Sequence, residues 1–274
     1  MRTGSAFNVR AGEAYDALAP GYDILTRDYA YDRWLPALER LALDQGLAGR
    51  RLLDVACGTG SSFLPLRARG YEVTGCDISD EMLRLARRKA PEVPLHQLDM
   101  RELPVLGSFD LVTCIDDGLN YLLEEHELEA ALRGIARNLA PGAIAVWDLN
   151  TVAQYRGQLA HDYVVDDEDI FIGWHGHGRE GGVGPGDLVE IAIDVFVRTE
   201  GGTWERSRSA HRQRHWPRPT VERLSRNAGL QLLDVRGQHP GVVIDSGLDE
   251  LTHTKAIYLA CANEEASCTS AARN

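Results

Sequence analysis

The sequence predicts an α/β fold in which a doubly wound parallel sheet is followed by an antiparallel β meander. Between residues 51 and 148, short apolar runs rich in β-branched side chains alternate with helical segments, as in a parallel sheet covered on both faces. After Asn150 the hydrophobic period changes to two residues, and glycine-rich or polar turns separate the runs. That change indicates a meander of about three strands.

The predicted elements follow one another in a regular order. Strands are predicted over 50–57, 71–79, 93–100, 109–117 and 142–150, and then over 169–178, 188–200, 203–216, 230–237 and 252–262. Helices are predicted over 61–70, 79–90, 124–140 and 220–230. The second helix has Ser79 as its expected N-cap and stops before Pro91, and the third ends at Pro141 and Gly142.

Composition and charge restrict the possible functions. The chain has 274 residues, 44% hydrophobic and 26% charged, which is ordinary for a globular protein. Its formal net charge of -12 repels polyphosphate at long range and disfavours a nucleic-acid partner. No apolar stretch reaches the roughly 18 residues of a membrane helix, and the N-terminus lacks the apolar core of a secretory signal. Five cysteines without a CxxC pair indicate buried thiols in a reducing compartment, so a cytoplasmic location is expected.

The motif LLDVACGTG, residues 52–60, ends the first strand at the edge where doubly wound sheets bind ligands. Gly58 and Gly60 allow the backbone to approach a ligand closely, although a plain strand–helix turn is the alternative. A dinucleotide would need a third glycine where Phe63 stands, which contradicts a nicotinamide-dependent oxidoreductase. S-adenosylmethionine carries an ammonium and a sulfonium group, and the carboxylate of Asp54 suits such a cationic ligand.

Acidic residues also end the next two strands. Asp77 can accept hydrogen bonds from both hydroxyls of a ribose, although it could instead be a neighbour of a helix cap. Asp99 could bind an adenine amino group while Met100 packs on the ring. Ile115, at the end of the fourth strand, could cover the other face of that ring.

Five segments in this order resemble the motifs of the class I S-adenosylmethionine-dependent methyltransferases: LLDVACGTG, VTGCDISDEML, LDMRELP, FDLVTCIDDGLNYL and LAPGAIAVWDLNT. The segment AYDALAPGYDILTRDYAYDRWLPAL resembles the tyrosine-rich lead-in helices of a small-molecule branch, similar to the sugar N-methyltransferases. The resemblance extends over about residues 12–262. It implies a seven-stranded Rossmann-like sheet with an antiparallel β cap inserted after the fifth strand.

The resemblance also implies how the chain is divided. The expected parts are N-terminal lid helices over 1–50, an S-adenosylmethionine-binding α/β core over 51–150, an antiparallel substrate cap over 151–217, the return of the core over 218–262 and a disordered tail over 263–274. The cap strands and the loop HPGVVIDSGLDEL, residues 239–251, are expected to determine the methyl acceptor.

By this resemblance the strand ends bind successive parts of the cofactor. The methionine part lies against Asp54 and the two glycines, the ribose against Asp77, and the adenine against Asp99 and Met100. Tyr15 and Tyr22 are interpreted either as core aromatics or as a lid whose ring faces stabilise the sulfonium. The expected cofactor contacts are Tyr15, Tyr22, Asp54, Ala56, Gly58, Gly60, Asp77, Ile78, Met82, Asp99, Met100, Arg101, Ile115 and Asp116.

Histidines of the meander are candidates for a general base. His175 and His177 share one face of a strand, and His211 and His215 share one face of another. If the two faces meet in the pocket, the histidines could supply a general base. Alternatively, they face solvent or pack on Trp216. A metal site is a further alternative, but no carboxylate lies at ligand spacing from these histidines. The predicted catalytic residues are His211, His215 and Asp117; the predicted substrate contacts are Tyr22, Asn120, Tyr121, His175 and His211; no metal is expected.

The predicted activity is methyl transfer from S-adenosylmethionine to a nitrogen or oxygen of a small molecule, with S-adenosylhomocysteine as the product. The acceptor is expected to be a secondary metabolite. In-line displacement at a sulfonium methyl requires mainly alignment and a dry site from the protein. A protein that binds S-adenosylmethionine without transferring its methyl group is an alternative on the same fold.

An RNA methyltransferase is a further alternative. Arg206, Arg208, Arg212 and Arg214 share one strand face. That face is interpreted as a solvated outer surface, as a site for an anionic small substrate, or as an RNA-contact stripe. The expected state is a monomer or homodimer without nucleic-acid or membrane partners.

Overall fold

A sheet of eight strands forms the centre of the computed structural model, which describes residues 11–178 and 182–263. The strands lie in the order β11-β10-β12-β5-β4-β1-β2-β3. Their bounds are β1 Arg51–Val55, β2 Glu72–Asp77, β3 Leu95–Gln97, β4 Phe109–Cys114, β5 Leu139–Asn150, β10 Leu230–His239, β11 Val243–Asp245 and β12 Lys255–Ala262. Strands β1 to β5 are parallel, and β12, β10 and β11 are antiparallel to their neighbours.

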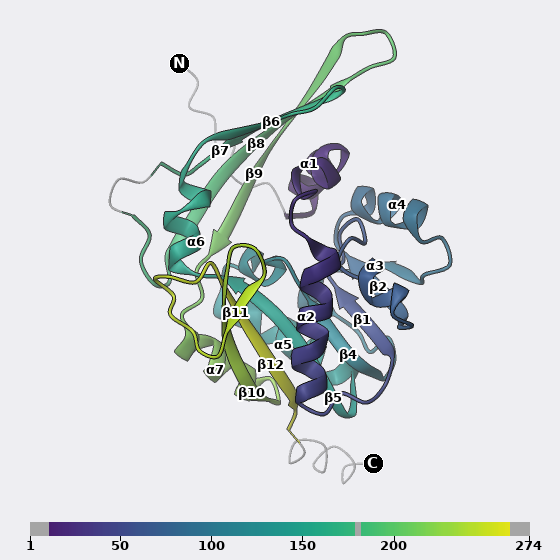
Figure 1. The fold of residues 1–274 in the computed structure, drawn as a ribbon, viewed down its shortest axis with the longest axis vertical. Coiled ribbons are helices and arrows are strands. Elements are labelled where there is room, and N and C mark those ends of the chain that lie inside the picture. Colours follow the sequence, from purple (N-terminus) through teal and green to yellow (C-terminus); the bar gives the residue numbers. More distant parts are fainter. Residues whose placement is uncertain (1–10, 179–181, 264–274) are drawn as a thin grey trace.

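The predicted doubly wound sheet with an antiparallel cap is confirmed. The seven expected strands are present, and β11 adds an eighth at the edge, within the segment 239–251, for which only a loop is predicted. The strand order reverses between β1 and β4, so the sheet has its switch point there. The carboxyl ends of the parallel strands face the cap (Figure 1).

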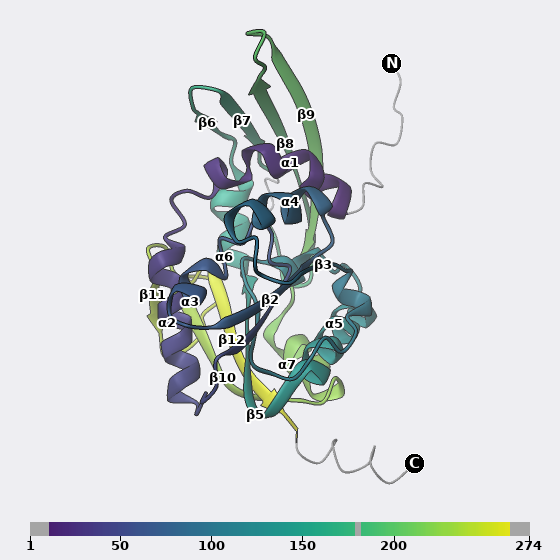
Figure 2. The same ribbon diagram turned by 90° about the vertical axis from the view of Figure 1, so that its right-hand side faces the viewer.

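Helices cover both faces of the central sheet (Figure 2). On one face lie α2 (Tyr31–Asp44), α3 (Leu64–Ala68) and α4 (Asp80–Lys89), and on the other lie α5 (Glu125–Asn138) and α7 (Arg218–Asn227). The hydroxyl of Ser79 accepts the Met82 N–H and caps α4, as predicted from the sequence. A capping box of Glu124 and Glu127 starts α5.

The cap is a four-stranded antiparallel sheet in the order β6-β7-β8-β9. Its strands are β6 Tyr163–Asp166, β7 Ile170–His175, β8 Leu188–Arg198 and β9 Trp204–Arg214, and α6 (Val152–Arg156) and η3 (Gln158–Ala160) connect it to β5. Strand β6 is an addition to the expected three, because four residues are too few to show a clear period. The apolar face of the cap packs on α1 (Ala11–Leu25), where Leu18 joins Ile172 and Ile193 (Figure 1).

The cysteines in the described residues are free, and Cys57, Cys76 and Cys114 are buried in the core, as expected of small apolar side chains. None of the helices within 11–178 and 182–263 has the length and apolar character needed to cross a membrane. Apart from Asn263, the tail that is expected to be disordered lies outside the described residues, as does Cys268.

Candidate active site

Two cavities meet at the carboxyl ends of the parallel strands. The first, of about 360 Å³, lies over β1, β2 and β4 and beneath α1. The second, also of about 360 Å³, lies between α1, the inner face of the cap and the segment 238–242. Four side chains line both cavities: Tyr15, Tyr22, Asp116 and Tyr121. These four residues mark the boundary at which the cavities are adjacent.

The glycine loop after β1 forms one wall of the first cavity. The N–H of Gly58 donates a hydrogen bond of 2.8 Å to Oδ2 of Asp77, and the N–H of Ser79 donates one of 2.9 Å to Oδ1. Burial raises the pKa of Asp77, although these N–H groups oppose the shift. Each carboxylate oxygen keeps a lone pair, so Asp77 can still accept ribose hydroxyls.

Asp54 does not face the first cavity, contrary to the expectation that its carboxylate meets a cationic ligand. It is 1% exposed and accepts hydrogen bonds from Ser62 at 2.5 Å and Thr113 at 2.6 Å. Thr113 pairs with Asp54 across β1 and β4, so both side chains point to the same side of the sheet. Burial raises the pKa of Asp54 to about 6, although the two hydroxyls lower it. Asp54 is therefore a buried residue that stabilises the glycine loop after β1.

Gly60 and Met82 also lie away from the first cavity, contrary to the prediction. Gly60 has a φ of +86°, and a Cβ there would lie 2.7 Å from the ring of Phe63. Turn geometry therefore requires this glycine. Met82 lies on α4 and is fully buried in the core.

The positions of Asp77 and Asp54 predict which of two matched variants binds S-adenosylmethionine more weakly. Asp77→Asn is expected to weaken S-adenosylmethionine binding by about 10- to 100-fold, because a charged acceptor becomes partly a donor. Asp54→Asn, the same change at the neighbouring strand, is expected to weaken binding less, because its side chain does not line the first cavity. Calorimetric titration of both variants measures the two dissociation constants. A larger loss in Asp54→Asn would contradict the placement of the ribose at Asp77.

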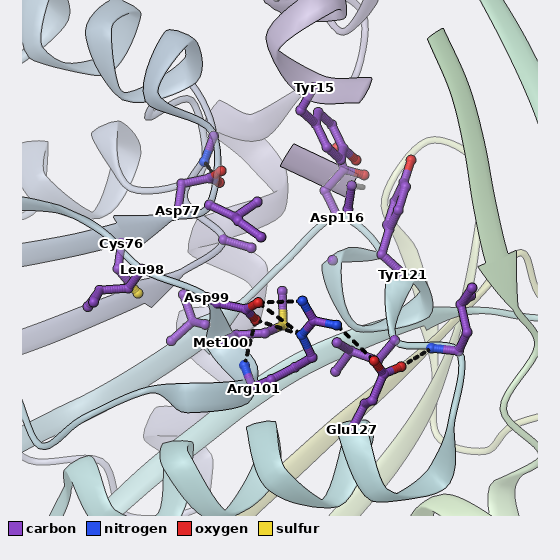
Figure 3. Close-up of a pocket in the computed structure, with 18 of the residues that line it drawn as sticks. Tyr15, Cys76, Asp77, Leu98, Asp99, Met100, Arg101, Asp116, Tyr121 and Glu127 are labelled. Carbon is purple, nitrogen blue, oxygen red and sulfur yellow. Dashed lines mark hydrogen bonds and ion pairs between the residues drawn. The ribbon is translucent and has the colours of Figure 1, made fainter. Parts of the chain in front are cut away.

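The far end of the first cavity combines apolar side chains with an ion-pair network. Leu98, Met100 and Ile115 line this end. Arg101 donates from Nε to both oxygens of Asp99, at 3.0 and 2.9 Å, and from Nη1 to Glu127 at 2.8 Å (Figure 3). Although burial opposes it, the hydrogen bonds from Arg101 lower the pKa of Asp99. An ionised acceptor beside an apolar pocket fits the amino group and ring of an adenine.

Tyrosine rings surround the boundary between the cavities. The ring centroid of Tyr15 lies 6.1 Å from that of Tyr22 and 5.2 Å from that of Tyr121. Burial raises the pKa of all three phenols well above their ordinary value, so they stay neutral. Neutral ring faces stabilise an adjacent cation. This arrangement fits the interpretation of Tyr15 and Tyr22 as a lid over a sulfonium.

Helix α1 closes over the first cavity and is tied to the core by two carboxylates. Asp16 accepts a hydrogen bond of 2.6 Å from the N-cap hydroxyl of α4. Asp23 accepts from the hydroxyl of Thr59 at 2.6 Å and from Nζ of Lys89 at 2.7 Å. The position of α1 therefore sets the aromatic walls of both cavities.

The turn after β4 is strained and is held by buried charges. Asp116 and Asp117 have φ values of +68° and +58°, in the left-handed region that residues other than glycine rarely adopt. Their N–H groups donate to the two oxygens of Asp148 at 2.5 and 3.2 Å. Nζ of Lys255 lies 2.7 Å from Asp148 and 3.3 Å from Asp116. Although burial opposes it, these carboxylates raise the pKa of Lys255, which stays charged.

Asp117 lines the second cavity with a carboxyl group of altered acidity. Its Oδ2 accepts hydrogen bonds from Asn150 at 2.8 Å and from Gln213 at 2.5 Å. Burial raises the pKa of Asp117 to about 7, with Lys255 lowering it and the other aspartates raising it further. A carboxylate that titrates near neutral pH can take a proton and release it again. Asp117 therefore stays the candidate general base.

His211 does not line either cavity, contrary to its prediction as a base and substrate contact. It is 1% exposed, with Nδ1 at 2.9 Å from the hydroxyl of Tyr121 and Nε2 at 2.9 Å from that of Ser209. Burial lowers its pKa to about 4, so the ring is neutral. Both ring nitrogens are occupied, and His211 orients Tyr121 instead.

Asn120 and His215 are also internal, contrary to their predicted roles. Asn120 is fully buried; it donates to the carbonyl of Arg214 at 2.8 Å and accepts from the N–H of Asn150 at 2.9 Å. His215 is fully buried, and its Nδ1 accepts from the backbone of Gly186 at 3.2 Å. Neither residue lines the two cavities.

His175 lies on the outer face of the cap, contrary to its prediction as a substrate contact. It pairs with Ala192 of β8, whereas His211 pairs with the preceding Ile191, so the two histidines point to opposite faces. Nε2 of His175 lies 2.8 Å from Asp194 on that outer face. The two histidine faces therefore do not meet in a pocket.

Four side chains near the boundary are not predicted by the sequence: Tyr31, Asp148, Gln213 and Lys255. The hydroxyl of Tyr31 donates to Asp116 at 2.7 Å. Asp148 lies near the carboxyl end of β5, so the rule that identifies Asp77 would also have found it. Lys255 begins β12, and only the antiparallel pairing of β12 with β5 brings it to the same edge.

The first cavity fits S-adenosylmethionine in size and chemistry. Cavities of about 300–1,000 Å³ hold ligands of this class, and the first cavity falls within that range. Asp77 can hold the ribose, the pair of Asp99 and Met100 the adenine, and the two lid tyrosines the sulfonium. The second cavity, across the boundary, is left for a methyl acceptor.

Comparison with known proteins agrees with this fit. Residues 52–142 match the family model described as a methyltransferase domain. YqeM of Bacillus subtilis (strain 168), which is named as a methyltransferase, is 32% identical over 223 residues, covering 80% of this chain and 87% of YqeM. The dTDP-4-amino-2,3,4,6-tetradeoxy-D-glucose N,N-dimethyltransferase of Saccharopolyspora spinosa is 35% identical over 145 residues, covering 53% of this chain and 56% of that enzyme.

Solved structures show the same fold. The structure of an S-adenosylmethionine-dependent methyltransferase from Clostridium acetobutylicum has a TM-score of 0.75 at 25% identity, covering 91% of this chain and 99% of that one. The predicted family, enzyme class and cofactor are thereby confirmed. The chain belongs to the S-adenosylmethionine-dependent methyltransferases.

Proposed function

We propose that the protein methylates an amine nitrogen of a small molecule that binds in the second cavity. The observation that carries this proposal is the boundary shared by the two cavities at Tyr15, Tyr22, Asp116 and Tyr121. A sulfonium methyl at this boundary can point out of the first cavity and into the second. In-line displacement requires that alignment of the nucleophile, the methyl carbon and the leaving sulfur.

The residues of the chain supply alignment, exclusion of water and proton transfer. When bound, S-adenosylmethionine supplies the methyl group and leaves as S-adenosylhomocysteine. Helix α1 and the inner face of the cap cover the boundary, which excludes water. The carboxylate of Asp117 takes a proton from the bound ammonium, and the nitrogen lone pair that this frees forms the new bond to the methyl carbon as the carbon–sulfur bond breaks. Release of that proton to solvent restores the base.

Charge and aromatic content favour nitrogen over oxygen as the acceptor atom. Asp28, Asp116 and Asp117 line the second cavity, and the ammonium of Lys255 is paired with Asp148 and Asp116. Tyr29, Trp34 and Trp174 add ring faces. Carboxylates and ring faces attract an ammonium group, whereas a neutral alcohol gains much less from them.

An amino sugar is the acceptor class that this chemistry suits. The relative from Saccharopolyspora spinosa is named for N,N-dimethylation of a dTDP-linked amino sugar, which supports that class here. A role in secondary metabolism and a monomeric or homodimeric state are part of the same proposal.

RNA is a poorer acceptor candidate because two of the four arginines on the shared strand face are paired within the cap, although Arg212 lines the first cavity. Arg206 and Arg208 lie on the outer face of β9, opposite His211. Both guanidinium groups pair with Asp194, at 2.7 and 3.5 Å. Their charge is thus partly neutralised within the cap. The interpretation as a solvated outer face is favoured for Arg206 and Arg208.

The test is a methylation assay with S-adenosylmethionine and matched acceptors. Each amino-sugar nucleotide is paired with the sugar that carries a hydroxyl in place of the amine, and products are followed by mass spectrometry together with S-adenosylhomocysteine. Methylated amine is expected, with little turnover of the hydroxyl analogue. Equal turnover of both analogues would contradict the preference for nitrogen. Binding of S-adenosylmethionine without transfer to any acceptor would instead favour the non-methylating alternative.

A further inference from the structure

Three metal-binding side chains converge at the edge of the central sheet, outside both cavities. His239 ends β10, Asp245 ends β11, and His253 precedes β12. Nε2 of His239 lies 3.2 Å from Oδ2 of Asp245, and Nε2 of His253 lies 3.1 Å from the same oxygen. The three ligand atoms all lie within 4.8 Å of one another.

We propose that His239, Asp245 and His253 form a binding site for a divalent transition-metal ion of the zinc type. Two imidazole nitrogens and one carboxylate oxygen are a ligand set that Zn²⁺ prefers, with a fourth position left for water. Tetrahedral coordination with bonds of about 2.0–2.1 Å places the ligand atoms roughly 3.4 Å apart. The distances of 3.2 and 3.1 Å are close to that separation, so small side-chain movements complete the site.

The backbone of Asp249 holds the ring of His253 in place. Nδ1 of this ring accepts a hydrogen bond of 2.9 Å from the N–H of Asp249 and lies 3.1 Å from the carbonyl oxygen of the same residue. Nε2 is the nitrogen that faces Asp245, and metal binding there would displace its proton. A Cβ at position 237 would lie 2.2 Å from that Nδ1, so Gly237 allows the ring to pack directly on β10. His253 is 7% exposed, whereas His239 and Asp245 are 37% and 52% exposed and leave access for the ion.

The ion would fasten one wall of the second cavity. Pro240, Gly241 and Val242 line that cavity and lie between His239 and Asp245 in the sequence. In the structure, imidazole–carboxylate hydrogen bonds join the three side chains, and the pairing of β10 with β11 holds the segment between them. Coordination would join β10, β11 and the approach to β12 at one point. This proposal differs from the sequence-based expectation of no metal, which considers only the histidines of the cap.

Cobalt titration tests the site independently of any methylation. The protein is used without a histidine tag, and Co²⁺ is followed by its visible absorption, with Zn²⁺ as the competitor. The wild type is expected to bind one equivalent with micromolar or tighter affinity. His239→Asn and Asp245→Asn, both at exposed positions, are each expected to lose affinity by at least tenfold. His96→Asn, at an exposed histidine on the opposite edge of the sheet, is the matched control and should bind as the wild type does.

A second readout separates a defined site from surface binding. Zn²⁺ is expected to raise the Tm of the wild type and of His96→Asn, because a ligand that binds the folded state shifts the unfolding equilibrium. It is not expected to raise the Tm of His239→Asn or Asp245→Asn. Binding only at millimolar metal, or equal binding by all four proteins, would overturn the proposal. Failure of the methylation assay would leave both metal readouts unaffected, so the two proposals can fail separately.

Discussion

Asp117→Asn is expected to lower kcat by about 10²- to 10⁴-fold, the usual contribution of a positioned general base. The amide keeps the shape of the carboxylate and can still accept the hydrogen bonds of Asn150 and Gln213, so the fold of the turn should persist. It cannot take the proton that the amine gives up. The affinity for S-adenosylmethionine should stay close to that of the wild type, because Asp117 lines only the second cavity.

The pH profile distinguishes loss of a base from loss of structure. Because the pKa of Asp117 is raised to about 7, its active, ionised form predominates only above that pH. The kcat/KM of the wild type should therefore rise with pH through about 7 and then level off. Asp117→Asn should lose this inflection at about pH 7. Asp166→Asn, the same change on an exposed cap strand, serves as control, and an unchanged inflection in Asp117→Asn would exclude Asp117 as the base.

Lys255→Met is expected to lower the free energy of unfolding by about 3–5 kcal/mol, the cost of removing one partner of a buried ion pair. The side chain of Asp148 is 0% exposed and would keep a charge without its cation. The same change releases the strained turn at Asp116 and Asp117, so activity should fall as well. Urea unfolding at neutral pH measures the difference.

Two further variants test whether an unpaired charge causes the loss of stability that is expected in Lys255→Met. The only other lysine of the chain, Lys89, pairs with Asp23 at a partly exposed position, so Lys89→Met should cost less than about 1 kcal/mol. The double variant Asp148→Asn with Lys255→Met removes both charges and should recover part of the stability lost in Lys255→Met. If the double variant is no more stable than Lys255→Met, lost packing rather than an unpaired charge explains the effect.

Strand ends were the part of the site that the sequence could locate. Carboxyl ends of parallel strands gather at one edge, so Asp77 and Asp99 could be placed there from their positions alone. The same rule fails at Asp54, because a strand end does not determine toward which side of the sheet the side chain points. Thr113, its pair on β4, presents a hydroxyl that takes up the Asp54 carboxylate.

The cap shows a second limit of sequence patterns. Period two tells which residues of one strand share a face, but not which face of the next strand they join. That relation depends on register, which pairs His211 with Ile191 and His175 with the next residue, Ala192. A shift of one residue would have placed both histidines on the same face. The position of Lys255 could not be predicted for a related reason, because it depends on which strand β12 pairs with.

Helix α1 supplies tyrosines to both cavities and is held on the core by Asp16 and Asp23. We therefore expect these contacts to affect the order in which the cofactor and the acceptor bind. If the helix lifts when S-adenosylmethionine exchanges for S-adenosylhomocysteine, the hydrogen bonds of Asp16 and Asp23 must break. Lifting it also dismantles the wall against which the acceptor rests. An acceptor that binds before the cofactor would find this wall of the second cavity incomplete and would dissociate. The geometry thus favours a compulsory order, with the methyl donor entering first and its spent form departing last.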